Sequence, residues 1–320
     1  MNNITLELRK QARKLLEDQV VQLVIGYGRG SDPFRVTPVF VRHPDFVDSL
    51  IWNPFCINNL AKYLIEYRYL PGKIAVVIKG CDSRAVNRLI QDNQIERDKI
   101  VLLGVPCTGI LEAEKVAKTT GYQLELERCS EQEEKFTLHT SSGDFSFAAK
   151  DSLITKCYSC YNHNPVVFDI MLGPAAKENP AAVKYSEVES LEKLNVKEKS
   201  EYWDMYFSRC LRCYACRNVC TACTCQECIF NQAKPAWVDR INNLSNNTSF
   251  HLIRAFHVAG RCVDCGECDR VCPVNIPLRH LNQKILKDLQ ELYDAPIPGA
   301  DLETGPALGC FVTEDPEEFM

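Results

Sequence analysis

Two runs of four cysteines in the C-terminal half share one spacing, C-x2-C-x2-C-x3-C. The runs comprise Cys210, Cys213, Cys216 and Cys220, and then, 52 residues later, Cys262, Cys265, Cys268 and Cys272. Cysteine thiolates are the usual ligands of iron–sulfur clusters. Three cysteines two residues apart let a tight loop wrap three corners of a four-iron cubane, whereas the fourth has turned away from that loop. The spacing therefore predicts two four-iron clusters.

This spacing is that of bacterial two-cluster ferredoxins, in which the fourth cysteine of each run serves the other cluster. Pro273 follows Cys272 and stops the chain from folding back over the same cluster. One predicted ligand set is Cys210, Cys213 and Cys216 with Cys272, and the other is Cys262, Cys265 and Cys268 with Cys220. Structural zinc is the alternative, although zinc sites usually come as two separated C-x2-C pairs.

The overall composition is that of an ordinary globular protein, with 320 residues, 46% hydrophobic and 25% charged. The net charge of −5 argues against nucleic-acid binding, which requires a basic face. The apolar runs, such as Val20–Ile25, fall well short of the roughly 20 residues that cross a bilayer, and Met1–Asp18 lacks the apolar core of a signal peptide. We therefore expect a cytoplasmic protein, in which the 18 cysteines are metal ligands or catalytic thiols rather than disulfides.

Three further cysteines closely follow the first run: Cys223, Cys225 and Cys228. A plain ferredoxin has no use for them, so they are predicted to hold three corners of another iron–sulfur cluster, or a zinc ion. Cys56 is the candidate fourth ligand, and Cys310 or Cys129 could serve instead. Reduced thiols near the ferredoxin surface are the competing interpretation.

Cys81 and Cys107 occupy equivalent positions in the N-terminal half, each after an expected strand and before an expected helix. Open α/β sheets bind ligands at the carboxyl ends of their strands, where helix N-termini favour anionic groups. Together with the C-x2-C pair of Cys157 and Cys160, these thiols make a complete set for a third cluster. The alternatives are inert core cysteines and a redox-active dithiol at Cys157 and Cys160.

Strands and helices alternate over the first half of the chain, which predicts a parallel sheet covered by helices. Expected strands cover Val20–Ile25, Ile74–Lys79 and Lys99–Val105, and expected helices cover Asn58–Arg68, Asp82–Gln94 and Ile110–Thr119, with Asp82 or Ser83 as an N-cap. A β-rich stretch, Gln123–Lys150, follows. The segment Gly26–Gly30 is not a G-x-G-x-x-G motif and is expected to be a loop.

The second half is expected to be mainly helical. Helices are predicted at Ser190–Phe207, Phe250–Val258 and Leu278–Leu292, and His251 and His257 are expected only to cap or pack. The fold class is thus an α/β N-terminal domain with a mostly parallel sheet, followed by a mainly helical dicluster ferredoxin domain. The expected boundaries are 1–152 for the α/β domain, 153–200 for a cysteine-containing loop and linker, 201–295 for the ferredoxin domain, and 296–320 for an extended tail.

The stretches Lys79–Val86 and Gly104–Gly109, with the later C-x2-C pair, resemble the beta subunits of deazaflavin-reducing hydrogenase and formate dehydrogenase. Those proteins show a Gly-x-Pro-Cys turn and a later C-x2-C pair around a cubane cluster. The resemblance covers residues 20–170, and residues 201–285 resemble the helical ferredoxin modules of heterodisulfide reductase. Together, these resemblances imply an electron-transfer subunit that couples to a hydrogenase, formate dehydrogenase, heterodisulfide reductase or related flavoprotein.

The preferred hypothesis is therefore a multi-cluster electron-transfer subunit of an anaerobic oxidoreductase complex, with other redox subunits as partners and no substrate site of its own. The alternative is a subunit that binds FAD or FMN and itself takes electrons from a reduced nucleotide or deazaflavin. Members of the resembled family bind flavin through a longer domain than this sequence shows. A third hypothesis is a scaffold in which the clusters are only structural.

Overall fold

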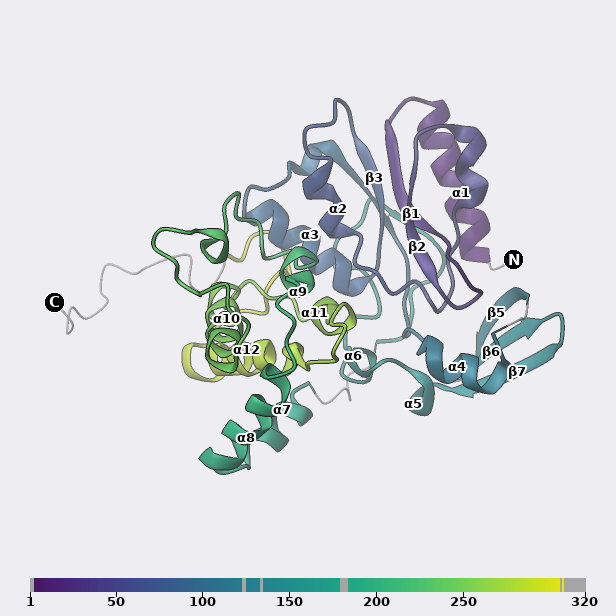
Figure 1. Cartoon of the computed structure of the whole chain (residues 1–320). Coiled ribbons are helices and arrows are strands. Elements are labelled where there is room, and N and C mark those ends of the chain that lie inside the picture. Colours follow the sequence, from purple (N-terminus) through teal and green to yellow (C-terminus); the bar gives the residue numbers. More distant parts are fainter. Residues whose placement is uncertain (1–2, 123–124, 133–134, 179–183, 306, 308–320) are drawn as a thin grey trace. The chain divides into compact units, whose positions relative to one another are not determined.

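The computed structural model describes residues 3–122, 125–132, 135–178, 184–305 and 307. The chain divides into two compact units (Figure 1). The first comprises Met1–Val86 and Asp92–Lys184, and the second comprises Asn87–Gln91 and Tyr185–Met320. Among the helices in the described residues, none combines the length and apolarity needed to cross a membrane.

A five-stranded sheet with the strand order β2-β1-β3-β4-β8 forms the centre of the first unit. Its strands are β1 (Leu23–Arg29), β2 (Val36–Val41), β3 (Ile74–Ile78), β4 (Ile100–Gly104) and β8 (Ile170–Met171). Strands β1, β3, β4 and β8 pair in parallel, and the edge strand β2 is antiparallel to β1. Every residue of β3 is buried, as expected of a strand covered on both faces. The predicted α/β class is confirmed, with a mixed sheet.

Helices and short helical turns connect these strands. They are α1 (Asn3–Glu17), η1 (Pro44–Ser49), α2 (Ala61–Glu66), α3 (Gly80–Gln91), η2 (Arg97–Lys99), α4 (Ala113–Thr120), α5 (Ala149–Ser152) and α6 (Thr155–Tyr158). In α1, Leu8, Ala12 and Leu15 are buried at the spacing of one helix face. Thr5 on the same face donates from Oγ1 to the carbonyl oxygen of Trp52 over 3.1 Å. This bond and the apolar face hold α1 beside the sheet (Figure 1).

A second, three-stranded antiparallel sheet consists of β5 (Leu126–Gln132), β6 (Lys135–Thr140) and β7 (Gly143–Ala148). Phe136 and Leu138 of β6 are buried and pack in one apolar cluster with Val116 of α4. The β-rich stretch expected at Gln123–Lys150 is thus present in its described residues.

Two local predictions in the first unit are wrong. Gly26–Gly30 is not a loop, because β1 continues to Arg29 and pairs with β2 over its length. A Cβ on Gly26 would lie 2.5 Å from Cδ2 of Leu50, so glycine here permits close packing on the strand. Asp82 and Ser83 are not N-caps, because α3 already begins at Gly80. Ser83 instead donates from Oγ to the carbonyl oxygen of Gly80.

Helices make up the regular structure of the described residues in the second unit. They are α7 (Ser186–Glu192), α8 (Val196–Phe207), α9 (Ala215–Asn218), η3 (Ile229–Asn231), α10 (Leu244–His257), α11 (Glu267–Arg270) and α12 (Leu278–Tyr293). The single helix expected at Ser190–Phe207 is two helices, because Asn195 and Glu198 form a capping box that starts α8. Most of the predicted tail lies outside the described residues.

Candidate iron–sulfur centres

The first predicted set of four cysteines lines one small cavity of the second unit. The cavity walls include Cys210, Cys213, Cys216, Cys272, Phe250, Ile276 and Leu278. Burial raises the pKa of the Cys216 thiol to about 11; the Arg254 guanidinium opposes this shift, and the other three thiolates of the set add to it. Cysteine thiolates are the usual ligands of iron–sulfur clusters. The cavity therefore brings the four cysteines of the first predicted set together.

Both cysteine runs fold in the same way. Arg212 and Tyr214 in the first run have left-handed backbone with φ of 49° and 59°, and Asp264 and Gly266 in the second have φ of 55° and 69°. Each pair precedes a short helix, α9 or α11. Left-handed backbone costs a non-glycine residue roughly 1–2 kcal/mol, and such strain gathers at functional sites. Here the left-handed residues lie where each cysteine loop curls before its short helix.

Backbone N–H groups in the two loops point at cysteine sulfurs. The N–H of Arg212 donates to Sγ of Cys210 over 3.4 Å. The N–H of Asp264 donates to the Cys262 thiol at the equivalent place in the second loop, and this bond lowers the pKa of that thiol against the larger effect of burial. Hydrogen bonds to the sulfurs are among the factors that set the potential of a cluster.

The second predicted set, Cys262, Cys265, Cys268 and Cys220, also gathers within the second unit. Burial raises the pKa of the Cys262 thiol, and nearby negative groups, including the thiolates of Cys220 and Cys265, add to the shift. Burial likewise raises the pKa of Cys268, where Cys262 and Cys265 add to it. The fourth cysteine of the first run is therefore among the groups that act on the second run, and its role as a ligand there stays a prediction.

Helix α12 supports the second loop through a buried ion pair. Nε and Nη2 of Arg279 lie 2.7 and 2.8 Å from the two carboxylate oxygens of Asp264. The backbone N–H of Arg279 also donates to Asp269 over 2.7 Å, and Nδ2 of Asn282 lies 3.7 Å from Sγ of Cys268. A two-pronged arginine–carboxylate bond fixes orientation as well as distance, so α12 holds the loop in place.

Helix α10 presents three buried polar side chains to the first set. Asn247 donates from Nδ2 to the carbonyl oxygen of Cys210 over 3.3 Å, and Nε2 of His251 lies 3.2 Å from Sγ of the same cysteine. Arg254 donates from Nη2 to the carbonyl oxygen of Cys216 over 3.0 Å. Burial, with a smaller effect of Arg254, lowers the pKa of His251 to about 3, so its ring is neutral.

These residues were not recognised from the sequence. His251 was expected only to pack or cap, and Arg254 was not singled out. The available signal was the spacing of Asn247, His251 and Arg254, which places three polar side chains on one face of a helix. That face is the buried one, where polar groups require a specific partner.

The third predicted set, Cys81, Cys107, Cys157 and Cys160, gathers in the first unit. Burial raises the pKa of Cys107, and the thiolates of Cys157 and Cys160 add to this shift while the Lys79 ammonium opposes it. Burial also raises the pKa of Cys81, and Cys160 is among the groups that add to it. The sheet brings Cys81 and Cys107 together because β3 and β4, which precede them, are parallel neighbours.

The loop after Cys160 is tied to both strand ends. The N–H of Cys107 donates to the carbonyl oxygen of His163 over 2.8 Å, and the N–H of Val166 donates to Oγ of Ser83 over 2.9 Å. A Cβ on Gly80 would lie 2.1 Å from the carbonyl oxygen of Asn162, so only glycine admits the loop at this distance. The absence of a side chain at Gly80 thus allows the loop after Cys160 to pack against the end of β3.

Lys79, at the end of β3, is almost completely buried beside the third set. Its Nζ lies 2.8 Å from a carboxylate oxygen of Asp82 and also donates to the carbonyl oxygen of Asn58 and to the hydroxyl of Tyr27. Burial lowers the pKa of Lys79, but Asp82 and the nearby thiolates more than reverse this and leave it raised. A fixed ion pair therefore stands next to Cys81 and Cys107.

The remaining cysteines are Cys223, Cys225 and Cys228 and their candidate fourth partners. Cys223 follows the first run and its N–H donates to the carbonyl oxygen of Cys220, Cys225 is exposed, and Cys228 packs on the apolar cluster of the second unit. Cys56 and Cys129 belong to the first unit, where burial raises the pKa of each to about 12. Cys310 lies outside the described residues. The fourth ligand stays a prediction.

The donor set in each group consists of thiols, which are the ligands that iron–sulfur clusters use. None of the 17 cysteines of the described residues forms a disulfide. Within those residues, no group of three or more His, Cys, Asp or Glu side chains is arranged to hold one metal ion. In a cubane each thiolate binds a different iron, so the sulfurs stand farther apart than four sulfurs about 2.3 Å from one zinc. Nε of Arg254, buried near both ferredoxin sets, also has no hydrogen-bond partner in the described part of the chain.

The geometry defines a class of protein with an α/β unit and a helical unit, both of which gather cysteines in sets of four. No family model matches the chain. Over nearly its whole length it is similar to the beta subunit of F420-dependent formate dehydrogenase from Methanocaldococcus jannaschii, with 24% identity covering 90% of this chain and 89% of the relative. The beta subunit of F420-dependent formate dehydrogenase 1 from Methanococcus maripaludis is 25% identical over 92% of this chain and 90% of its own.

Among solved structures, the chain is similar to part of the F420-reducing [NiFe] hydrogenase complex from Methanosarcina barkeri. The overlap covers 50% of this chain and 58% of that one, with 18% identity and a TM-score of 0.40. The resemblance to formate dehydrogenase beta subunits that the sequence motifs predict is confirmed by the two full-length matches.

Proposed function

We propose that this chain is an electron-transfer subunit of an oxidoreductase complex and carries two ferredoxin-type four-iron clusters and a third cluster in its α/β unit. The observation that carries the proposal is that Cys272 of the second run lines one cavity with the first run, while Cys220 of the first run acts on the Cys262 thiol of the second. Exchange of the fourth cysteine between two runs of this spacing is typical of two-cluster ferredoxins. The similarity to formate dehydrogenase beta subunits supports the same conclusion.

Each part of the chain has a separate task in this proposal. The clusters, when bound, supply reversible one-electron transfer. The backbone N–H groups of Arg212 and Asp264 orient cysteine sulfurs, and the neutral ring of His251 lies with Nε2 3.2 Å from Sγ of Cys210. The Asp264–Arg279 pair holds the second loop against α12. The partners would be other redox subunits of a formate dehydrogenase, hydrogenase or heterodisulfide reductase complex, in the reducing cytoplasm that free thiols require.

Iron and acid-labile sulfide analysis of the anaerobically purified chain tests this function. About eight irons per chain indicate the two ferredoxin clusters, about twelve add the Cys81 set, and about sixteen add a cluster at Cys223, Cys225 and Cys228, since each cubane holds four. Electron paramagnetic resonance after dithionite reduction then shows whether the clusters accept electrons. A folded chain without iron and sulfide would contradict the proposal, and clusters that never change spin state would favour the scaffold hypothesis.

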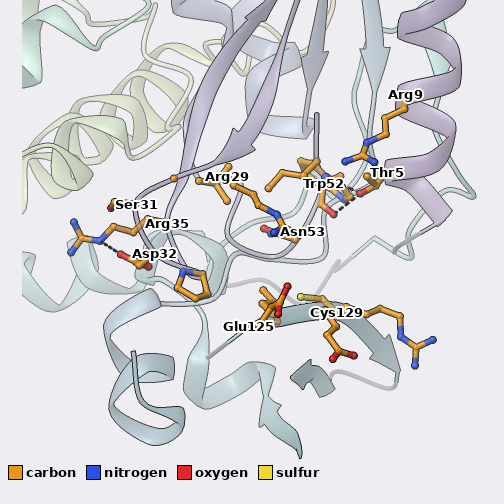
Figure 2. A pocket seen from close by; sticks show the side chains of 17 residues that line it. Thr5, Arg9, Arg29, Ser31, Asp32, Arg35, Trp52, Asn53, Glu125 and Cys129 are labelled. Carbon is orange, nitrogen blue, oxygen red and sulfur yellow. Dashed lines mark hydrogen bonds and ion pairs between the residues drawn. The ribbon is translucent and has the colours of Figure 1, made fainter. Parts of the chain in front are cut away.

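A second candidate function is direct electron uptake from a bound nucleotide-type cofactor such as FAD or FMN. A cavity of about 840 Å³ in the first unit is bordered by Cys107 and also by Arg128 and His139. A neighbouring cavity of about 440 Å³ shares Trp52, Asn53, Arg128 and Cys129 with it and adds the side chains of Arg9 and Arg29 (Figure 2). Cavities of 300–1,000 Å³ are typical of cofactor sites, and the arginines suit an anionic group.

Flavin fluorescence of the supernatant after denaturation tests this second function. Stoichiometric flavin in the wild-type chain, and its loss in Arg128→Gln with unchanged iron content, would establish the cofactor site. Arg240→Gln is the matched control, because Arg240 is exposed and lies outside both cavities. Absence of flavin from a protein with full iron content would leave the electron-transfer proposal standing alone.

A further inference from the structure

Arg254 is a buried cation that has no carboxylate partner in the described residues. Its side chain, in the last turn of α10, is 4% exposed. Two other buried cations near the cysteine sets have carboxylate partners: Lys79 pairs with Asp82, and Arg279 pairs with Asp264. Arg254 instead makes one hydrogen bond, from Nη2 to the carbonyl oxygen of Cys216, and within the described residues its Nε–H has no acceptor.

The negative groups around Arg254 come from both ferredoxin sets. Burial lowers the pKa of its guanidinium, but the thiolates of Cys220, Cys268, Cys223 and Cys216 more than reverse this. Conversely, Arg254 lowers the pKa of Cys216 in the first set and of Cys268 in the second, against the larger effect of burial. One guanidinium therefore acts on ligands of two centres.

A buried charge without a counter-ion is strongly destabilising. The burial of Arg254 is thus explained only if a negative group lies beside it in the folded protein. The negative groups that act on it are cysteine thiolates, among them Cys216 of the first set and Cys220 and Cys268 of the second. A planar guanidinium with several N–H donors can serve more than one such group at once.

We propose that Arg254 is the shared counter-ion of the two ferredoxin clusters, a positioning residue that raises the reduction potentials of both. The inference rests on the proposed function, because it requires both clusters to be present. Each cluster gains one negative charge when it is reduced, so a fixed positive charge in a medium of low dielectric constant favours the reduced form. Because the same charge faces both sets, its removal should affect both clusters.

Redox titration of the anaerobically purified full chain, followed by electron paramagnetic resonance, tests the inference. The variants are Arg254→Gln, which removes the charge, and Arg254→Lys, which keeps it. The matched control is Arg209→Gln, because Arg209 adjoins the ligand Cys210 in sequence but is exposed to solvent. We expect the glutamine variant to shift both midpoint potentials to more negative values, the lysine variant to stay near the wild type, and the control to leave both unchanged.

Several results would overturn the inference: a shift of only one cluster, no shift in the glutamine variant, or equal shifts in the glutamine and lysine variants. If the glutamine variant takes up no iron, the lysine variant tests the inference instead. The inference requires the lysine variant to retain both clusters near their wild-type potentials. Loss of either cluster from the lysine variant contradicts the inference. Failure of the proposed function is distinguishable, because the wild-type chain itself would then contain no iron or sulfide.

Discussion

Arg212 and Asp264 stand 52 positions apart, yet both have left-handed backbone and both donate their N–H to the cysteine two residues earlier. The next left-handed position in each loop is Tyr214 in one run and Gly266 in the other. The repeated cysteine spacing is therefore a repeated backbone conformation as well. Each loop has its own requirement for left-handed residues, which makes the two loops separately testable.

Replacement of Gly266 by valine should disable the second loop and spare the first. A β-branched residue at φ 69° is strained by roughly 1–2 kcal/mol or more, so we expect Gly266→Val to lose about four irons per chain, the content of one cubane. Iron and sulfide analysis measures the loss. Gly266→Asn is the control, because asparagine tolerates left-handed backbone, and it should keep its full content. Equal iron in both variants would show that this conformation is not required.

The exchange of the fourth ligands predicts which cysteine variants resemble one another. Cys272→Ser should give the same residual spectrum as Cys213→Ser, because both disturb the first set. Cys220→Ser should match Cys265→Ser in the same way, because Cys220 and Cys265 both lie beside Cys262. Electron paramagnetic resonance of the four reduced variants makes the comparison. If Cys272→Ser instead matched Cys265→Ser, each run would hold its own cluster and the exchange would be wrong.

The parts of the structure that the sequence predicts well are those encoded locally. The cysteine spacing predicts a tight loop in each run, because a few consecutive residues decide its conformation. The run Ile74–Ile78 predicts a buried strand, because five apolar residues in a row suit a strand covered on both faces. The edge strand β2 was not predicted, since it is held by pairing with β1 rather than by a pattern of its own.

Residues that act through tertiary contacts were missed. Arg254 and Lys79 look like ordinary surface cations in the sequence, and only the fold shows that both are buried beside thiols. The break between α7 and α8 was also missed, because a capping box competes with the helical pattern that continues across it. For the two buried cations the decisive information is a partner that is distant in sequence. For the helix break it is a local hydrogen bond that overrides the helical pattern.

His251 should influence the first cluster alone. Its Nε2 is 3.2 Å from Sγ of Cys210, and its ring stacks on Phe207 with centroids 4.7 Å apart. His251→Phe keeps an aromatic ring but removes the donor, so we expect a more negative midpoint potential for one cluster and no change for the other. Redox titration of the purified chain measures both. A shift of both clusters, or of neither, would contradict this role for the Nε2–H group.

Gly80 should be required for the third centre only. A Cβ there would stand 2.1 Å from the carbonyl oxygen of Asn162, so Gly80→Ala must displace the loop that carries Cys157 and Cys160. We expect a fall from about twelve irons to about eight, the ferredoxin pair remaining. Gly305→Ala is the control, because a Cβ at that position meets nothing within 4 Å. An unchanged iron content in Gly80→Ala would show that the loop can move without loss of the cluster.

Lys79 and Asp82 should behave as one unit in the stability of the α/β unit. Both side chains are at most 1% exposed, and Nζ lies 2.8 Å from the carboxylate. Lys79→Met leaves a buried carboxylate without its cation, which should lower the free energy of unfolding by about 3–5 kcal/mol. Asp82→Asn leaves the ammonium without its anion and should be destabilising for the same reason.

The double variant Lys79→Met with Asp82→Asn should be less destabilised than the sum of the two single variants, because no uncompensated charge is left in the core. Coupling energies of about 0.5–3 kcal/mol are usual for residues in one network. Urea denaturation of the anaerobic protein, followed by circular dichroism, gives the four free energies of the cycle. Strictly additive effects would mean that the two charges do not stabilise each other, and that Lys79 is held in the core by its hydrogen bonds to Asn58 and Tyr27 instead.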